Sequence, residues 1–582
     1  MKNRRCFSCL FFFDFLVFAF FLFNLDTSIL AQNPCSGNIV FRRQSQVDSF
    51  PILYPGCRVV NGFITITGND ITSLDSLSSI REVKGDLVVR YTTKLKSLNG
   101  LSNIENVALG FIIIFNDSLQ VIDQFNALKS ASYIDIQDNN QITAINGFNA
   151  VANTGKITLQ DHKKLESINA FHGLNKASDI FITNNKMLKS ITGFNSGVEY
   201  GGVKIDKNPV LEKIVGFDKV KKVKSIRIGD NAVRELKGFY ELDSISNSWL
   251  QIEDERFLEI LQGFDSLKYC QGLQFSNLYL LKELPKFENL IRVDGPLYVK
   301  NANLLNSISA FKNVRIVTSQ LRISSNIEMT SIDAFQNLDS CFTLIIEGAN
   351  KLKTINGFQK LTYIDEVFDL FSASLEKING FQSLTEIAGL KNQEVDSNQW
   401  INFQFQAHKL KSIKDFSNLK RVRGISFRGN YELTDFSPLD NLDTSYVKYV
   451  DIWGNPKLQT CNTKFLCSFL DNKAKKAYLR DNAPGCNTRE EILATCITGT
   501  DEWHTTITAN GVYPNPCPLN APLRFEGWDA DFDLTLYNSL GSVVYKGAQH
   551  NPVSLPVSIG GMYFYKVKTA GKSGSGAVVV TE

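Results

Sequence analysis

Pairs of apolar residues separated by one position recur along most of the chain every 22 to 25 residues, with one longer interval. The cleanest copy reads Ile180, Ile182, Asn185, Leu188 and Ile191. Its opening alternation is the period of a short strand with two inward residues. Seventeen copies predict a β-rich solenoid of stacked parallel coils, since one coil alone buries too little apolar surface to fold. The first inward residues are expected at Ile64, Leu87, Ile112, Ile134, Ile157, Ile180, Val203, Ile226, Leu250, Leu273, Leu297, Leu321, Leu344, Phe368, about Ile401, Ile425 and Val450.

An asparagine recurs five residues after the first inward residue of a coil. Stacked amides satisfy the backbone groups that a tight turn leaves unpaired, so we expect an asparagine ladder. The alternative is that these are ordinary turn residues. His162 stands at the same position, and we expect a turn residue there rather than a ligand. The asparagines are Asn69, Asn139, Asn185, Asn208, Asn231, Asn326, Asn430 and Asn455.

A phenylalanine recurs in twelve consecutive coils about fourteen residues after the strand, often directly after a glycine. Rings at one fixed phase are expected to stack along the axis and fill the back of the core, where the glycine eases the turn. The series comprises Phe125, Phe148, Phe171, Phe194, Phe217, Phe239, Phe264, Phe287, Phe311, Phe335, Phe358 and Phe381.

The cysteines predict disulfide caps at both ends of the array. Cys35 and Cys57 bracket the segment before the first coil. Four more follow the last coil and allow three pairings, of which we favour Cys461 with Cys486 and Cys467 with Cys496. A zinc site is the alternative, but the paired C-x2-C spacing is missing. Cys270 and Cys341 share one phase three coils apart, about 14 Å by strand spacing, so both are expected to be free and buried. Cys517 is the odd cysteine.

The N-terminus predicts export. Basic residues precede an apolar run from Leu10 to Leu25, and Ala31 offers a small residue for cleavage, which is typical of a secretory signal peptide at residues 1–31. The run is short for a membrane span, and we expect no transmembrane segment in the mature chain. An oxidising compartment outside the cytoplasm is consistent with disulfides.

Composition and motifs exclude several functions. With 62 basic and 59 acidic residues, and no basic block, nucleic-acid binding is not expected. The five histidines are scattered, and no H-E-x-x-H, G-x-S-x-G, Walker or calcium-loop motif occurs. We therefore expect no catalytic residues, no metal, no cofactor and no enzymatic activity.

After residue 511 the sequence pattern changes to apolar runs separated by Gly and Pro turns, which predict a small antiparallel β-sandwich. Its motifs are the run from Tyr513 to Pro516, Leu536-Tyr537-Asn538 with Gly541, and Gly561-Met562-Tyr563 with Tyr565. In this order they resemble the sorting domain of Bacteroidota type IX secretion substrates. The resemblance implies that residues 512–582 engage the type IX secretion machinery and are then removed. The remainder is released or attached to the outer-membrane surface.

The repeat array resembles leucine-rich repeats of the receptor L-domain variety, a family without a catalytic centre. The expected organisation is a signal peptide at 1–31, an N-terminal cap at 32–62, the solenoid at 63–460, a Cys-rich cap at 461–497, a linker at 498–511 and the sorting domain at 512–582. Residues 388–400 are an insertion or a degenerate coil.

Outward residues of the strands are the candidate binding site. Side by side they are expected to form a polar and aromatic face that binds an unknown protein or glycan. The plain alternative for each residue is a solvated sheet face. We expect a recognition or adhesion protein, with a structural surface component that self-associates as the alternative. The candidates are Phe181, Lys204, Arg227, Tyr298, Lys300, Arg322 and Trp453.

Overall fold

The computed structural model describes residues 34–389, 401–496, 512–526, 528, 531–569 and 572–581. The expected signal peptide, the expected linker and nearly all of the expected insertion lie outside these residues. The chain divides into two compact units, residues 1–294 and 295–582. None of the described helices has the length and apolar character that crossing a membrane requires.

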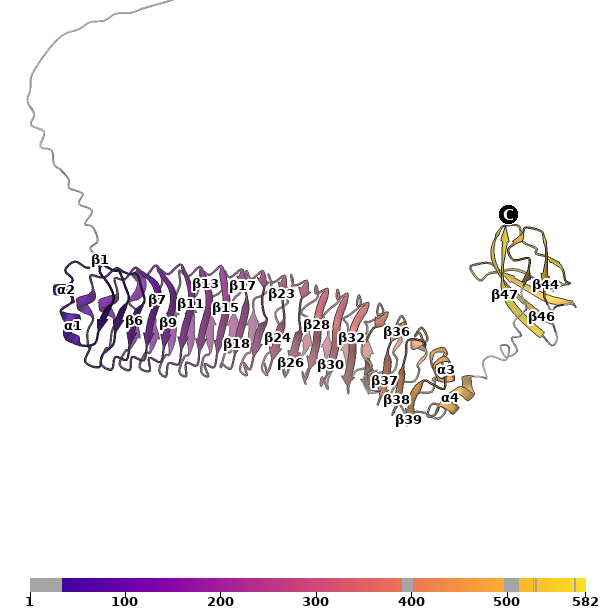
Figure 1. Ribbon diagram of the computed structural model, residues 1–582. Coiled ribbons are helices and arrows are strands. Elements are labelled where there is room, and N and C mark those ends of the chain that lie inside the picture. The colour runs from indigo at the N-terminus through magenta and orange to yellow at the C-terminus, as the bar shows by residue number, and fades with distance from the viewer. Residues whose placement is uncertain are drawn as a thin grey trace, which may run out of the picture. The chain divides into compact units, whose positions relative to one another are not determined.

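Residues 34–294 form a parallel β-solenoid in which every coil adds one strand to the main row of a long sheet (Figure 1). Neighbouring strands pair one coil apart, as Ile180 with Val203 and Val203 with Ile226. The main row consists of β2 (Ile39–Phe41), β4 (Ile64–Ile66), β6 (Leu87–Arg90), β7 (Asn106–Ile114), β9 (Ser130–Gln137), β11 (Asn153–Gln160), β13 (Lys176–Thr183), β15 (Glu199–Asp206), β18 (Ser225–Gly229), β21 (Leu250–Glu253) and β24 (Leu273–Ser276).

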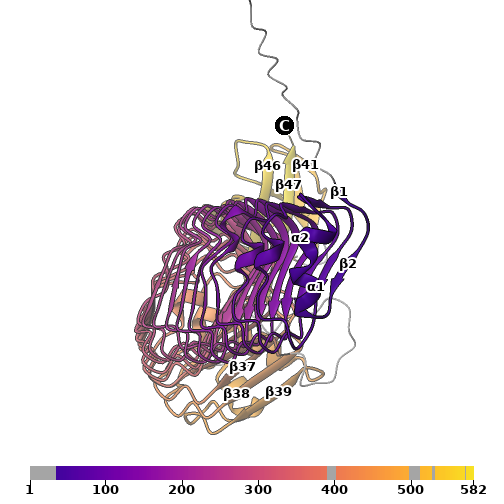
Figure 2. The ribbon, with the colours of Figure 1, turned by 90° about the vertical axis from the view of Figure 1, so that its left-hand side faces the viewer.

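Short strands extend this sheet on one side, and a second parallel sheet forms another wall of the coils. The helices α1 (Gln44–Asp48) and α2 (Phe50–Leu53) lie at the N-terminal end (Figure 2). The short strands are β1 (Pro34–Cys35), β3 (Val59–Val60), β5 (Glu82–Val83), β17 (Lys222–Val223), β20 (Ser244–Ile245), β23 (Tyr269–Cys270) and β25 (Arg292–Val293). The second sheet contains β8 (Val121–Ile122), β10 (Ala144–Ile145), β12 (Ser167–Ala170), β14 (Ser190–Gly193), β16 (Lys213–Val215), β19 (Glu235–Lys237) and β22 (Ile260–Gln262).

The second unit repeats this architecture and ends in a helical cap. Its main row consists of β26 (Leu297–Lys300), β28 (Ile316–Ser324), β30 (Ser340–Glu347), β32 (Tyr363–Ser372), β35 (Phe403–Ala407), β37 (Gly424–Arg428), β38 (Tyr449–Trp453) and β39 (Lys476–Arg480). Beside it lie β34 (Glu386–Ile387) and β36 (Arg421–Val422), and another wall holds β27 (Ser307–Ile308), β29 (Ser331–Ile332), β31 (Thr354–Ile355) and β33 (Lys377–Ile378). The cap helices are α3 (Lys464–Asp471) and α4 (Arg489–Cys496).

A small β-structure of three- and five-stranded sheets closes the chain. Two motif asparagines organise it. Asn515 accepts from the Val579 N–H at 2.8 Å and donates to the Ala577 carbonyl at 3.0 Å. Asn538 closes the β43–β44 turn by accepting from the Ser542 N–H at 2.9 Å. The strands are β40 (Val512–Tyr513), β41 (Cys517–Pro518), β42 (Pro522–Phe525), β43 (Phe532–Tyr537), β44 (Val543–Gln549), β45 (Val553–Ser554), β46 (Gly561–Thr569) and β47 (Lys572–Thr581).

The number of coils differs from the predicted seventeen. The main rows hold eleven strands in residues 34–294 and eight in residues 295–496, so the solenoid has about 19 turns. The extra strands, β2 and β39, lie in segments expected to be caps, where Ile39 pairs with Ile64 and Ala477 with Val450. Each end segment thus pairs one further strand with the outermost predicted coil.

Two expected strand positions are wrong by one or two residues. Leu87 pairs with Phe111 rather than Ile112, and Phe368 pairs with Phe403 rather than Ile401. Residues 111–114 are all apolar, so a period of two cannot tell which residues point inward. Burial decides it, because Phe111 is 1 % exposed.

A polar ladder runs through the solenoid turns as expected. In the first unit, the backbone N–H of a ladder residue donates to the side chain of the ladder residue one coil further, at 3.0 to 3.2 Å. The donating residues are Asn116, Asn139, His162, Asn185 and Asn208. His162 takes its place in this series, and its Nδ1 accepts from the Asn139 N–H at 3.1 Å. Asn69 is exposed, so its predicted place in the ladder is wrong. At the ladder position of the next coil the chain has Thr92 instead of an asparagine.

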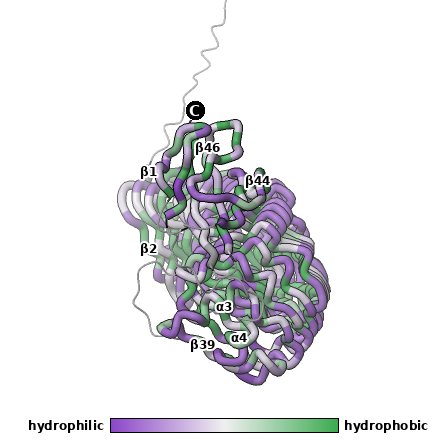
Figure 3. Tube along the Cα trace, turned by 90° about the vertical axis from the view of Figure 1, so that its right-hand side faces the viewer, coloured by the Kyte–Doolittle hydropathy of each residue, from purple (hydrophilic) through white to green (hydrophobic). Residues whose placement is uncertain are grey.

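The phenylalanine row is also confirmed within each unit. Phe148 and Phe171 stack with ring centroids 5.1 Å apart at 6°, and Phe358 and Phe381 at 5.0 Å and 10°. The row rings are buried, and along the coils hydrophilic residues follow the outer turns (Figure 3). Most row phenylalanines themselves have a positive φ, 57° at Phe194 for example, and so do several of the glycines before them, such as Gly193 and Gly216. The expected role of glycine in the tight turn is therefore confirmed at these coils, and the phenylalanine shares it.

The cysteines follow the expected scheme. Disulfides join Cys35 to Cys57, Cys461 to Cys486 and Cys467 to Cys496, with Cα atoms 5.8 to 5.9 Å apart. The remaining described cysteines, Cys270, Cys341 and Cys517, are free and buried. Burial raises the pKa of Cys270 to about 12, so its thiol stays protonated at neutral pH.

Candidate functional site

The candidate site is the outward face of the main sheet row, here called the sheet face. Parallel register places its side chains in straight columns. In the first unit one column reads Phe181, Lys204, Arg227, Gln251 and Gln274. Three predicted site residues, Phe181, Lys204 and Arg227, therefore lie on consecutive strands.

Charges in this column are neutralised within the protein. Arg227 Nε lies 3.4 Å from Asp206 Oδ2, and its Nη atoms contact Glu253 and, at 3.6 Å, Asp230. Lys204 Nζ lies 3.3 Å from the same Asp206 oxygen. The half-buried Arg227 is thus fixed by three carboxylates, and a ligand would meet two cations paired with three carboxylates rather than a free cation.

The second unit carries the other four predicted residues. Tyr298 is paired in register with Arg322, and Lys300 Nζ lies 3.9 Å from the Tyr298 ring centroid. Burial and the neighbouring Arg322 lower the pKa of Lys300. Arg322 in turn forms an ion pair with Glu347.

Trp453 forms an aromatic and cationic cluster near the C-terminal end of this row. Its Nε1 donates to Asp481 Oδ2 at 2.8 Å, and the Arg480 guanidinium lies 4.6 Å from the ring centroid. Tyr478 lies 4.9 Å from the same guanidinium. Arg428 approaches the ring at 5.9 Å and is paired with the buried Asp451. These contacts hold the indole in one orientation.

A cavity of about 190 Å³ opens on the sheet face between the Arg322 and Trp453 clusters. Glu347 and Asp369 lie on one side and Arg428 on the other, with the amides of Gln404 and Gln406 between them. Phe371, 44 % exposed, also lines it. The cavity therefore combines an aromatic surface, two amides and charges of both signs.

The Asp369 carboxyl is the most perturbed acid in this cavity. Burial, followed by the nearby Glu347, raises its pKa to about 6. Its Oδ1 is buried without a hydrogen-bond partner among the described residues. This oxygen is an acceptor that a hydroxyl or amide of a ligand could satisfy.

The sequence prediction missed these cavity residues although the signal was present. Phe368 and Leu370 point inward, so Asp369 and Phe371 must point outward by alternation. The irregular interval that follows Phe368 hid the continuation of the columns through Gln404.

Within the described residues, no three His, Cys, Asp or Glu side chains gather as a metal site would require.

One family model matches part of the solenoid. Residues 56–138 match the Receptor L domain family. A search of the curated proteins finds no match. Among solved structures, YopM from Yersinia enterocolitica is 14 % identical, with 65 % of this chain and 86 % of that chain covered at a TM-score of 0.21. A leucine-rich repeat protein from Bacteroides ovatus is 16 % identical, with 72 % and 86 % covered at 0.17. The family match supports a solenoid of receptor L-domain type, a fold typical of ligand-binding and interaction proteins.

Proposed function

We propose that this is a non-enzymatic recognition or adhesion protein that binds a protein or glycan through the sheet face. The observation that carries the proposal is the cavity between Glu347 and Arg428, lined by Phe371 and two amides. Aromatic, amide and guanidinium groups around a small hollow are the groups that dominate recognition surfaces. Charges of both signs beside two amides favour a polar ligand.

Rigid side chains support the same proposal. Trp453 is held by Asp481 and Arg480 before any ligand arrives, so little side-chain entropy is lost on binding. The unsatisfied Asp369 oxygen adds a directed acceptor. We assign Phe371, Gln404 and Trp453 as the main contacts, with Tyr298, Lys300 and Arg322 at the border.

The proposed location is the cell surface or the medium. Three disulfides support an oxidising compartment. We infer export through the type IX secretion machinery. The motif residues Asn515 and Asn538 support this inference because their side chains form hydrogen bonds that hold the C-terminal β-structure together. Removal of residues 512–582 would then leave the solenoid released or surface-attached.

The test is binding of the full chain to an array of immobilised polysaccharides and extracellular proteins. Trp453→Ala and Phe371→Ala should each weaken the strongest signal by about tenfold or more, as expected of central aromatic contacts. Tyr240→Ala is the matched control, since Tyr240 is an exposed aromatic beside the phenylalanine row and off the sheet face. Equal losses in all three variants would contradict the assignment.

Absence of any array ligand would favour the structural alternative. In that case sedimentation of the full chain at micromolar concentration should reveal self-association that Trp453→Ala weakens. A monomer without an array ligand would contradict both the recognition and the structural functions.

A further inference from the structure

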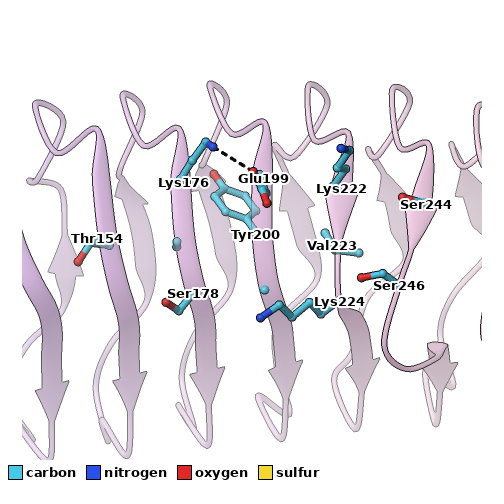
Figure 4. A pocket seen from close by; sticks show the side chains of 12 residues that line it. Thr154, Lys176, Ser178, Glu199, Tyr200, Lys222, Val223, Lys224, Ser244 and Ser246 are labelled. Atoms are coloured by element: carbon cyan, nitrogen blue, oxygen red, sulfur yellow. Dashed lines mark ion pairs between the residues drawn. The ribbon is translucent and has the colours of Figure 1, made fainter.

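A second, chemically different groove lies in the first unit, apart from the column of Phe181, Lys204 and Arg227. It has a volume of about 540 Å³ and runs across the first halves of β13 and β15 to β17 and β20 (Figure 4). Lys176, Glu199 and Lys222 form one row by register, and Ser178 and Lys224 lie below them in the view. The sheet-face column of Phe181 and Lys204 occupies the second halves of the same strands.

A glycine, Gly201, lies on β15 in the lining of the groove. A Cβ built on Gly201 would lie 1.5 Å from the Ser178 carbonyl oxygen, so no other residue fits the chain path there. Gly201 therefore lets the backbone of β15 pass close to Ser178 of β13 on this side of the groove. In Figure 4 the Lys224 side chain extends toward β15. Tyr200, 1 % exposed, closes the inner side and donates its hydroxyl to the Leu174 carbonyl at 3.2 Å.

The side chains that line the groove carry a net positive charge. Lys176 Nζ pairs with Glu199 at 3.0 Å. Among the described residues, Lys222 and Lys224 have no carboxylate within ion-pair distance. Three lysines against one glutamate leave a charge of +2, in contrast to Arg227 with its three carboxylates. Uncompensated cations in a concave site attract anions.

We propose that this groove binds an acidic polysaccharide through carboxylate or sulfate groups. Lys176 and Lys222 lie two strands apart, about 10 Å by strand spacing, which suits charges that recur along a sugar chain rather than a single small anion. The hydroxyls of Ser178 and Ser246 line the groove and suit sugar hydroxyls. Single-stranded nucleic acid is disfavoured because its binding sites stack bases on exposed rings, and the groove's aromatic residue is buried.

The experiment compares four probes on the full chain: heparin for sulfate, polygalacturonate for carboxylate, dextran as a neutral polysaccharide and single-stranded DNA. At least one acidic polysaccharide should bind, with affinity that falls as salt rises. Binding of heparin would identify sulfate, and binding of polygalacturonate would identify carboxylate, as the group that the groove recognises. Dextran binding as tight as both, or DNA binding tighter than both, would overturn the proposal.

Charge reversal locates the site. Lys222→Glu with Lys224→Glu should reduce acidic polysaccharide binding by at least about tenfold, or 1.4 kcal/mol. Both lysines are exposed, so folding should persist, as an unchanged thermal midpoint would verify. Lys94→Glu with Lys96→Glu is the matched control, since this exposed pair has the same spacing and lies outside the groove. An equal loss in the control would refute the groove as the site. Trp453→Ala should leave this binding unchanged, so failure of the sheet-face function and failure of the groove are distinguishable.

Discussion

Glu255 and His162 are two ionisable side chains in a ladder otherwise made mostly of amides. Glu255 accepts from Asn231 Nδ2 at 2.6 Å and from the Val233 N–H at 3.1 Å. Burial raises its pKa to about 7, and burial lowers the pKa of His162 to about 4. Both shifts favour the neutral form, because a charge inside the stack loses its hydration.

The two shifts predict pH effects of opposite sign. Folded Glu255 holds a proton that the unfolded chain has lost above about pH 4.5, so its contribution to stability falls as pH rises toward 7. Relative to the wild type, Glu255→Gln should therefore gain about 2 to 3 kcal/mol in unfolding free energy between pH 5 and pH 8. His162→Asn should instead lose about 2 kcal/mol over the same interval, since unfolded histidine is protonated below about pH 6.5.

Urea unfolding at pH 5 and pH 8 measures both variants. Each substitution also changes hydrogen bonds, but that offset does not depend on pH and cancels in the difference. Slopes of equal sign for the two variants would show that the ladder charges are not the cause.

At the scale of the element, the phenylalanine row ties successive coils together. Phe217 stacks on Phe194 at 5.1 Å and on Phe239 at 5.2 Å, and it is fully buried. Its φ of 66° lies in a region that non-glycine residues rarely adopt. The packing of the ring must therefore offset this backbone strain.

Phe217→Ala should lower the unfolding free energy by about 3 to 5 kcal/mol, because the strain stays while the stacked ring is replaced by a cavity. Hydrogen exchange should accelerate first in the coils around Phe194 and Phe239, since each coil contacts only its neighbours. Tyr240→Ala, at an exposed position beside Phe239, should change stability by no more than about 0.5 kcal/mol. Uniform acceleration along the whole first unit would argue against the local role of the ring.

How much of this was readable from the sequence depended on how regular each element is. The phenylalanine row and the ladder were predictable because one residue type recurs at one phase. The strand at Phe111 was misplaced because four consecutive apolar residues carry no alternation. β39 was missed because Lys476, Tyr478 and Arg480 mask its inward Ala477 and Leu479. The cavity at Phe371 depended on a register that passes an irregular interval, which spacing alone does not resolve.

At the scale of the whole chain, the ends of the stack are closed by covalent bonds as well as by strands. β39 pairs with β38, and the Cys461–Cys486 disulfide links the segments on either side of it. An open sheet edge would template aggregation, and the charged side chains of β39 discourage it.

Cys461→Ser with Cys486→Ser should lower stability by about 2 to 4 kcal/mol through the freed loop. Frayed cap segments should also increase aggregation on heating, which light scattering measures. Cys270→Ala is the control, since it removes a buried free thiol and leaves every disulfide intact. Equal aggregation of the double variant and the Cys270→Ala control would show that the disulfide does not protect the sheet edge.

Corresponding residues pair in successive coils, and this regularity also affects how the gene for such a chain can change over generations. Ile180 meets Val203, and Val203 meets Ile226, each exactly one repeat later in the gene as well as in space. Duplicating or deleting one complete repeat therefore restores every stacked ring and amide, whereas losing a single codon within a strand turns its inward residues outward. Length is thus inherited in whole modules, and a lineage can lengthen or shorten its solenoid without redesigning it.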